Sequence, residues 1–80
     1  MALDKNRQAP DFTIRTYLFR ELALLYFPSS TPDTASKAFR RMINACKGLP
    51  DAMENKGYLP GVKTLPPLLV ATIVRFLGEP

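Results

Sequence analysis

The sequence predicts a mainly α-helical fold: a small domain of three to four helices with a helix-turn-helix-like core and at most a short strand or wing. Two observations predict this class. Apolar residues recur at helical spacing along most of the chain, and proline and glycine fall where such helices would begin and end. Because 80 residues hold one core, we assign residues 12–80 to a single helical domain and residues 1–11 to a flexible, polar N-terminal arm.

The first elements expected are a short strand and a helix. Residues 12–17 alternate with the period of two that is typical of a strand or an extended lead-in. A first helix is expected over residues 18–26, and Pro28 ends it because proline disfavours helical geometry in the preceding residue. The stripe predicted to be buried in this helix contains Leu18, Leu22, Leu25 and Tyr26.

The second helix has the clearest signals in the chain, over the segment TPDTASKAFRRMINAC at residues 31–46. Thr31 is a favourable N-cap, Pro32 suits the first helical position, and Asp33 complements the helix dipole. Gly48 lies just beyond the end, where glycine is favoured. The predicted buried stripe contains Ala35, Ala38, Phe39, Met42, Ile43 and Cys46, so we interpret the single cysteine as a small core residue rather than a reactive thiol.

The remaining chain predicts two further helices. A short third helix is expected to begin at Pro50 or Asp51 and to end at Gly57. A turn or small wing at Pro60 and Gly61 then leads to a fourth helix, which Thr64 caps and Gly78 ends. Its predicted stripe contains Leu65, Leu68, Leu69, Thr72, Ile73, Phe76 and Leu77, while Val70 and Val74 lie off it. Because this helix is apolar almost all round, we expect it to be deeply buried or to contact another chain.

The residue types argue against an enzyme. The chain has no histidine, which is the commonest general base and the commonest metal ligand, and its one cysteine cannot replace it. Its seven carboxylates show no spacing that suggests shared acid–base work, and we interpret Glu21 as a solvated or capping charge. We therefore expect no catalytic residue, no cofactor and no metal site.

Composition also bears on location. With one cysteine there is no internal disulfide, which favours a reducing, cytoplasmic setting. The N-terminal residues contain no apolar run of the kind that signal peptides need, and the longest apolar stretch, residues 65–77, is too short to span a bilayer. We expect a soluble protein with no membrane partner.

A DNA-binding face is the most specific functional hypothesis. The net charge of +4 permits attraction to nucleic acid, and two helices joined by a short turn suggest a helix-turn-helix. Arginine and asparagine pair with guanine and adenine edges, and threonine and lysine hold phosphates. The candidate contacts with double-stranded DNA are five residues on the outer face of the second helix and one in the wing: Thr34, Lys37, Arg40, Arg41, Asn44 and Lys63.

Two other interpretations stay open. Any amphipathic surface helix needs a polar side, and the connection YFPSST at residues 26–31 is longer than a usual helix-turn-helix turn and lacks its glycine. The rival function is a protein–protein interaction module, a homodimer for example, that uses Val70, Val74 and Phe76 of the last helix.

Several short motifs also resemble a known family. IRTY, ELALLYFP, TPDTA and the ending FLGEP, spread over residues 12–80, resemble the small uncharacterised Bacteroides proteins grouped as domain of unknown function 4248. The resemblance implies a single domain and carries no established activity. By looser analogy, ELA followed by TPDTASKAFRRMI is similar to the opening of excisionase-like and MerR-like DNA-binding domains, which is a fold-level association.

Overall fold

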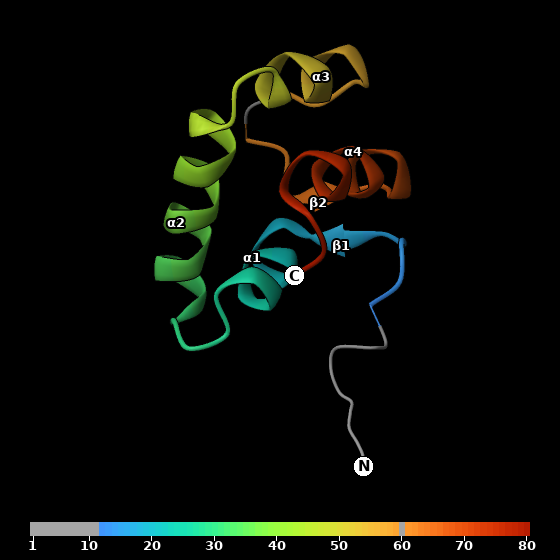
Figure 1. The fold of residues 1–80 in the computed structure, drawn as a ribbon. Coiled ribbons are helices and arrows are strands. Elements are labelled where there is room, and N and C mark those ends of the chain that lie inside the picture. The colour runs from blue at the N-terminus through green and yellow to red at the C-terminus, as the bar shows by residue number, and fades with distance from the viewer. Residues whose placement is uncertain (1–11, 60) are drawn as a thin grey trace.

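The computed structural model describes residues 12–59 and 61–80, which form four helices and a two-stranded antiparallel sheet (Figure 1). The predicted mainly α-helical class is confirmed. The predicted arm, residues 1–11, lies outside the described residues, as does Pro60 of the predicted turn. In chain order the elements are β1 (Tyr17–Leu18), α1 (Phe19–Tyr26), α2 (Pro32–Ala45), α3 (Leu49–Asn55), β2 (Thr64–Leu65) and α4 (Pro67–Leu77).

The sheet joins two segments that are far apart in the sequence. Tyr17 pairs with Leu65 and Leu18 pairs with Thr64, and the backbone N–H of Phe19 donates to the carbonyl of Lys63 at 2.7 Å. The expected strand over residues 12–17 is therefore much shorter than its alternating pattern. The expected capping of the last helix by Thr64 is wrong, because Thr64 belongs to β2 and Pro66 takes the N-cap position.

Helices α1 and α2 pack against each other through aromatic rings. Phe39 is completely buried, and its ring centroid lies 5.1 Å from that of Phe19 and 5.1 Å from that of Tyr26, at the two ends of α1. The buried stripe predicted for α2 is confirmed: Ala35, Phe39 and Ile43 are buried, and Ala38, Met42 and Cys46 are partly buried. The predicted cap is also confirmed, because the Oγ1 of Thr31 accepts a hydrogen bond from the backbone N–H of Thr34 at 3.3 Å.

The buried side of α1 differs from the prediction at two positions. Leu18 and Leu25 are more than two-fifths exposed, whereas Phe19, Leu22 and Ala23 form the buried side. Leu18 turns outward because it belongs to β1, so the helix begins one residue later than expected. The capping interpretation of Glu21 is confirmed, since its Oε1 accepts from the backbone N–H of Leu18 at 3.1 Å.

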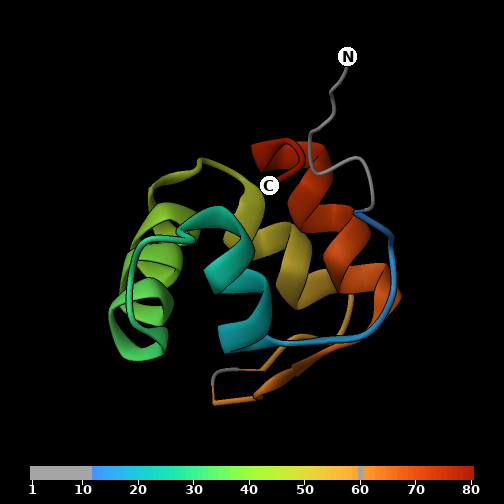
Figure 2. The same ribbon diagram turned by 90° about the horizontal axis from the view of Figure 1, so that it is seen from below.

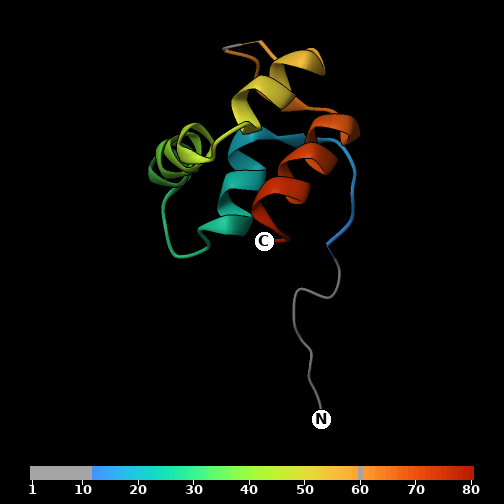
Figure 3. The ribbon, with the colours of Figure 1, turned by 45° about the horizontal axis from the view of Figure 1, so that its top comes forward.

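Helices α3 and α4 complete the core. Gly48 has a φ of 89°, a left-handed conformation that glycine adopts without strain, and it turns the chain from α2 directly into α3. Leu49 and Met53 of α3 are buried, as are four residues of α4: Leu69, Val70, Thr72 and Ile73. Figures 2 and 3 show α2 on one side of the domain and α4 on the other, with α1 and α3 between them. Of the described helices, none combines the length and apolar character needed to cross a bilayer.

Candidate nucleic-acid interface

The predicted contact residues of the second helix share one exposed side of α2. Thr34, Lys37, Arg40, Arg41 and Asn44 are all exposed, at spacings of three or four residues that bring side chains onto one side of a helix. We call these five residues the outer face of α2. The buried residues Ala35, Phe39 and Ile43 hold the opposite side against the core, so the core fixes the direction in which the outer face points.

Thr34 has a structural role as well. Its backbone N–H donates to the Oγ1 of Thr31, and its own Oγ1 accepts a hydrogen bond from the Thr31 hydroxyl at 3.0 Å. These two bonds close the first turn of α2. Thr34 therefore contributes to the start of the helix that carries the other four residues.

Arg40 is held in place by an aromatic ring of α1. Its guanidinium carbon lies 5.0 Å from the ring centroid of Phe19, which is 6% exposed. A guanidinium over an aromatic face is attracted by the electron-rich ring and keeps its N–H groups free at the edge. The contact thus orders Arg40 without consuming its hydrogen-bond donors.

A cavity of about 450 Å³ lies beside the outer face and brings Lys63 next to α2. We call it the cationic hollow. The charged and hydroxyl groups that line it come from α1, from α2 and from the segment before β2: Arg20, Asp33, Ser36, Arg40 and Lys63. The long-range pairing of β1 with β2 creates this arrangement, because it fixes the segment that carries Lys63 against the start of α1.

The cations of the cationic hollow have no ion-pair partner within the part of the chain that the structure describes. Within residues 12–59 and 61–80, Arg15 and Glu21 form an ion pair, with 3.5 Å between the Nη2 of Arg15 and the Oε2 of Glu21. Both side chains are exposed. Arg15 also lies over the Tyr17 ring, 3.8 Å from its centroid, so it is engaged away from α2. The three cations of the hollow face one acid, Asp33, and none of them forms an ion pair with a described residue.

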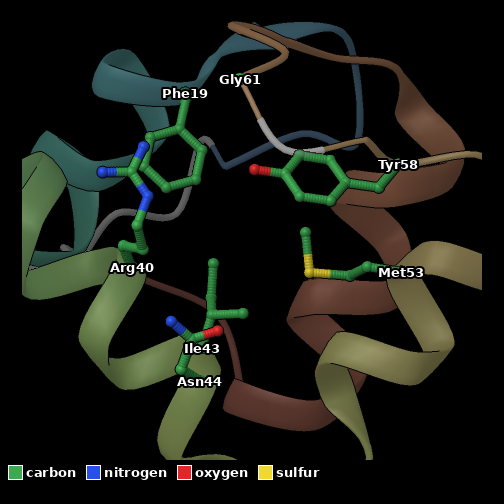
Figure 4. Close-up of a pocket in the computed structure, with 7 residues that line it drawn as sticks. All are labelled: Phe19, Arg40, Ile43, Asn44, Met53, Tyr58 and Gly61. Carbon is green, nitrogen blue, oxygen red and sulfur yellow. The ribbon is translucent and has the colours of Figure 1, made fainter.

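A second cavity, of about 320 Å³, adjoins the first one. Its walls are mostly apolar and aromatic, with Arg40 and Asn44 as the polar members (Figure 4). We call it the aromatic hollow, and it is lined by Phe19, Arg40, Ile43, Asn44, Met53, Tyr58 and Gly61. This site has no local signature in the sequence, because Met53 and Tyr58 reach α2 only through the packing of α3 and the segment after it.

Of the three residues predicted to form an interface on α4, one is exposed. Val70 is completely buried and Val74 is half-buried, whereas Phe76 is 40% exposed. The prediction that Val70 lies off the buried stripe is wrong, and Leu68, predicted to be buried, is 56% exposed. Because almost every position of α4 is apolar, neighbouring elements rather than periodicity decide which side is buried.

The chemistry of a metal or thiol site finds no support in the described part of the chain. Over residues 12–59 and 61–80, no three His, Cys, Asp or Glu side chains group together in a way that could hold a metal ion. Cys46 is a free, half-buried cysteine at the C-cap of α2, packed against the core.

Comparison with known proteins gives a family and no close relative of known function. The family model described as domain of unknown function (DUF4248) matches residues 13–80. Neither the curated proteins nor the solved structures contain a match to this chain. The match covers the sheet, all four described helices and both hollows, and the chain therefore belongs to the DUF4248 family.

Proposed function

We propose that this protein binds double-stranded DNA as a non-catalytic regulatory accessory domain, with α2 entering the major groove. The observation that carries the proposal is the gathering of five cations on α2 and around the adjoining cationic hollow: Arg20, Lys37, Arg40, Arg41 and Lys63. They account for nearly half of the eleven Lys and Arg residues in the chain. A cytoplasmic location is part of the same proposal.

The dimensions of α2 suit this role. A helix rises about 1.5 Å per residue, so the segment from Lys37 to Asn44 spans about 10 Å, or roughly three base pairs. The major groove of B-DNA is about 12 Å wide and admits one α-helix. In this arrangement Arg41 and Asn44 contact base edges, while Lys37 contacts the phosphate backbone.

The cationic hollow supplies contacts on one flank of α2. Arg20 of α1 and Lys63 of the segment before β2 are both exposed, and they lie on either side of α2 in the sequence. Phosphate contacts from such positions fix the register of a helix in the groove without reading sequence. Arg40 belongs to α2 and also lines the cationic hollow, so it can contact either a base or a phosphate.

The packing of α1 on α2 resembles the first two helices of a helix-turn-helix, in which one helix supports the recognition helix. The looser similarity to excisionase-like and MerR-like domains agrees with this at the level of fold association. The alternative, a homodimer through α4, has less support, because Val70 is buried within its own chain.

The proposal is tested by the salt dependence of duplex binding. Fluorescence anisotropy of a labelled, mixed-sequence duplex should give an affinity that falls steeply between 50 and 200 mM salt, on the order of 0.9 log units per log unit of salt for each phosphate neutralised. At 20 mM salt the Debye length is roughly 20 Å, so surface charges are only weakly screened. Micromolar protein that causes no anisotropy change under these conditions would contradict the proposal.

A further inference from the structure

The two hollows meet at Arg40. They share the lining residues Phe19, Arg40 and Gly61, so the two cavities adjoin each other. One end of the combined site is polar and positively charged, with Arg20 and Lys63. The other end is mostly apolar, with Ile43 and Met53 and the aromatic ring of Tyr58. Such a site is complementary to a ligand that joins an anionic group to a planar, weakly polar ring.

The charged end matches a phosphate monoester. Arg20, Arg40 and Lys63 together with Asp33 give the cationic hollow a net charge of +2. A phosphate monoester carries a charge of about −1.5 to −2 at neutral pH and has three strong acceptor oxygens. The hydroxyl of Ser36, also in the lining, adds an uncharged donor. A single carboxylate would leave about half of the positive charge without a partner.

The apolar end matches a nucleobase. Figure 4 shows the hydroxyl of Tyr58 directed toward the side of the cavity where Phe19 and Arg40 lie, with the Met53 side chain beneath the ring. Among the described residues, neither the Tyr58 hydroxyl nor the Asn44 side-chain amide has a hydrogen-bond partner, so both are available to a ligand. A volume of about 320 Å³ is at the low end of the range for ligand pockets, about 300–1,000 Å³, which suits one small ring system.

We propose that the two hollows together bind one nucleoside monophosphate unit, with its phosphate in the cationic hollow and its base in the aromatic hollow. The unit is either a free nucleotide or the 5′-phosphorylated terminal nucleotide of a single strand, since both present a phosphate monoester and a base. This binding does not require the proposed duplex binding, although both use Arg40.

The first test compares AMP with its two halves by isothermal titration calorimetry on the full chain. AMP is expected to bind at least about tenfold more tightly than adenosine or inorganic phosphate, because the ligand that spans both hollows gains from contacts at each end. Inorganic phosphate that binds as tightly as AMP would overturn the proposal, and so would the absence of heat from AMP at millimolar concentration.

Two adjacent arginines provide the matched pair of variants. Arg40→Gln should weaken AMP binding by about 10- to 100-fold, the loss expected for a hydrogen bond to a charged group. Arg41→Gln removes the same charge one residue away, outside both hollows, and should leave AMP affinity unchanged. Equal losses in the two variants would show a general charge effect and would overturn the proposal.

The base end has its own variants. Tyr58→Leu should weaken AMP binding about tenfold by removing the ring on which the base stacks. If this variant fails to fold, Tyr58→Phe keeps the ring, and only the contribution of the hydroxyl is lost, about threefold. AMP affinity is then measured in the variant that folds. An affinity equal to that of the wild type would contradict the placement of the base in the aromatic hollow.

Competition measurements identify the source of the nucleotide, and two variants separate nucleotide binding from duplex binding. A 5′-phosphorylated single-stranded oligonucleotide that displaces AMP at lower concentration than AMP itself would assign the unit to a strand, and the reverse order would assign it to a free nucleotide. Tyr58→Leu should leave duplex affinity unchanged and Arg41→Gln should lower it. Failure of nucleotide binding and failure of duplex binding are therefore seen in different measurements.

Discussion

The guanidinium carbon of Arg40 lies 5.0 Å from the ring centroid of Phe19, and the ring centroid of Phe39 lies 5.1 Å from the same point. Phe19 thus connects the core to the polar surface of α2. The buried Phe39 sets the position of Phe19, and Phe19 in turn sets the position of the Arg40 head group. The geometry of both hollows therefore depends on the packing of α1 against α2.

The first prediction concerns Asp33, the acidic group among the described residues of the cationic hollow. Asp33→Asn should strengthen duplex binding several-fold, because it removes repulsion between a carboxylate and the phosphates. It should also destabilise the domain by about 0.3–1 kcal/mol, because Asp33 lies in the first turn of α2 and complements the helix dipole. Anisotropy titrations and urea unfolding measure the two effects, and an unchanged duplex affinity would place the DNA away from this hollow.

The second prediction concerns the core beneath the site. Phe39→Ala should cost about 3–5 kcal/mol of unfolding free energy, because a fully buried ring is lost and a cavity remains. Phe76→Ala is the matched control, since Phe76 is 40% exposed, and it should cost much less. Urea denaturation followed by circular dichroism gives both values. Similar losses in the two variants would be incompatible with the packing of α1 and α2 described above.

The third prediction is a pH effect at Tyr26. Its hydroxyl donates a hydrogen bond to the carbonyl of Gly78, and burial, with a smaller contribution from the charge of Glu79, raises the pKa of Tyr26 from 10.0 to about 12. Because the folded pKa is above the unfolded one, the neutral phenol stabilises the fold fully below pH 10. This stabilisation is lost as the pH rises from about 10 to about 12.

Absorbance at 295 nm follows this titration directly. The wild-type protein should show a phenol that ionises near pH 12, and Tyr26→Phe should abolish that step and the associated loss of stability. A Tyr26→Phe variant whose titration curve has the same high-pH step as the wild type would assign the raised pKa to another residue.

The fourth prediction concerns the start of α2. Thr31→Ala should lower the unfolding free energy by about 1 kcal/mol, because the backbone N–H of Thr34 loses its side-chain acceptor. Ser29→Ala, at an exposed position in the preceding turn, should change stability by less than about 0.5 kcal/mol. A cost at Thr31 no greater than that at Ser29 would show that the cap contributes little.

Features of this fold that depend on local interactions were predictable from the sequence, whereas features that depend on long-range contacts were not. Helix α2 was predictable because its signals are local: Thr31 caps it, Pro32 starts it, and the buried stripe repeats at helical spacing. The assignment of Thr64 to a helix cap was wrong because its role depends on pairing with Leu18, a contact that no local pattern encodes. The same β1–β2 pairing shortens the expected strand.

For helix α4, the sequence did not predict which side is buried. Nearly all of its residues are apolar, so its sequence contains little information on which side is buried, and Leu68 and Val70 were exchanged between the surface and the core. For the site, the outer face of α2 followed from its own periodicity. The hollows did not, because they need Arg20 and Tyr58 to be brought to α2 by packing between elements.

The most direct test of duplex binding through α2 compares two arginine variants that carry the same change in charge. Arg41 is exposed on the outer face of α2, and Arg75 is exposed on α4. Arg41→Gln should weaken duplex binding by about tenfold or more, because it removes a contact to a base edge. Arg75→Gln should leave duplex affinity unchanged, whereas equal losses in both variants, or no loss at Arg41, would contradict the proposal.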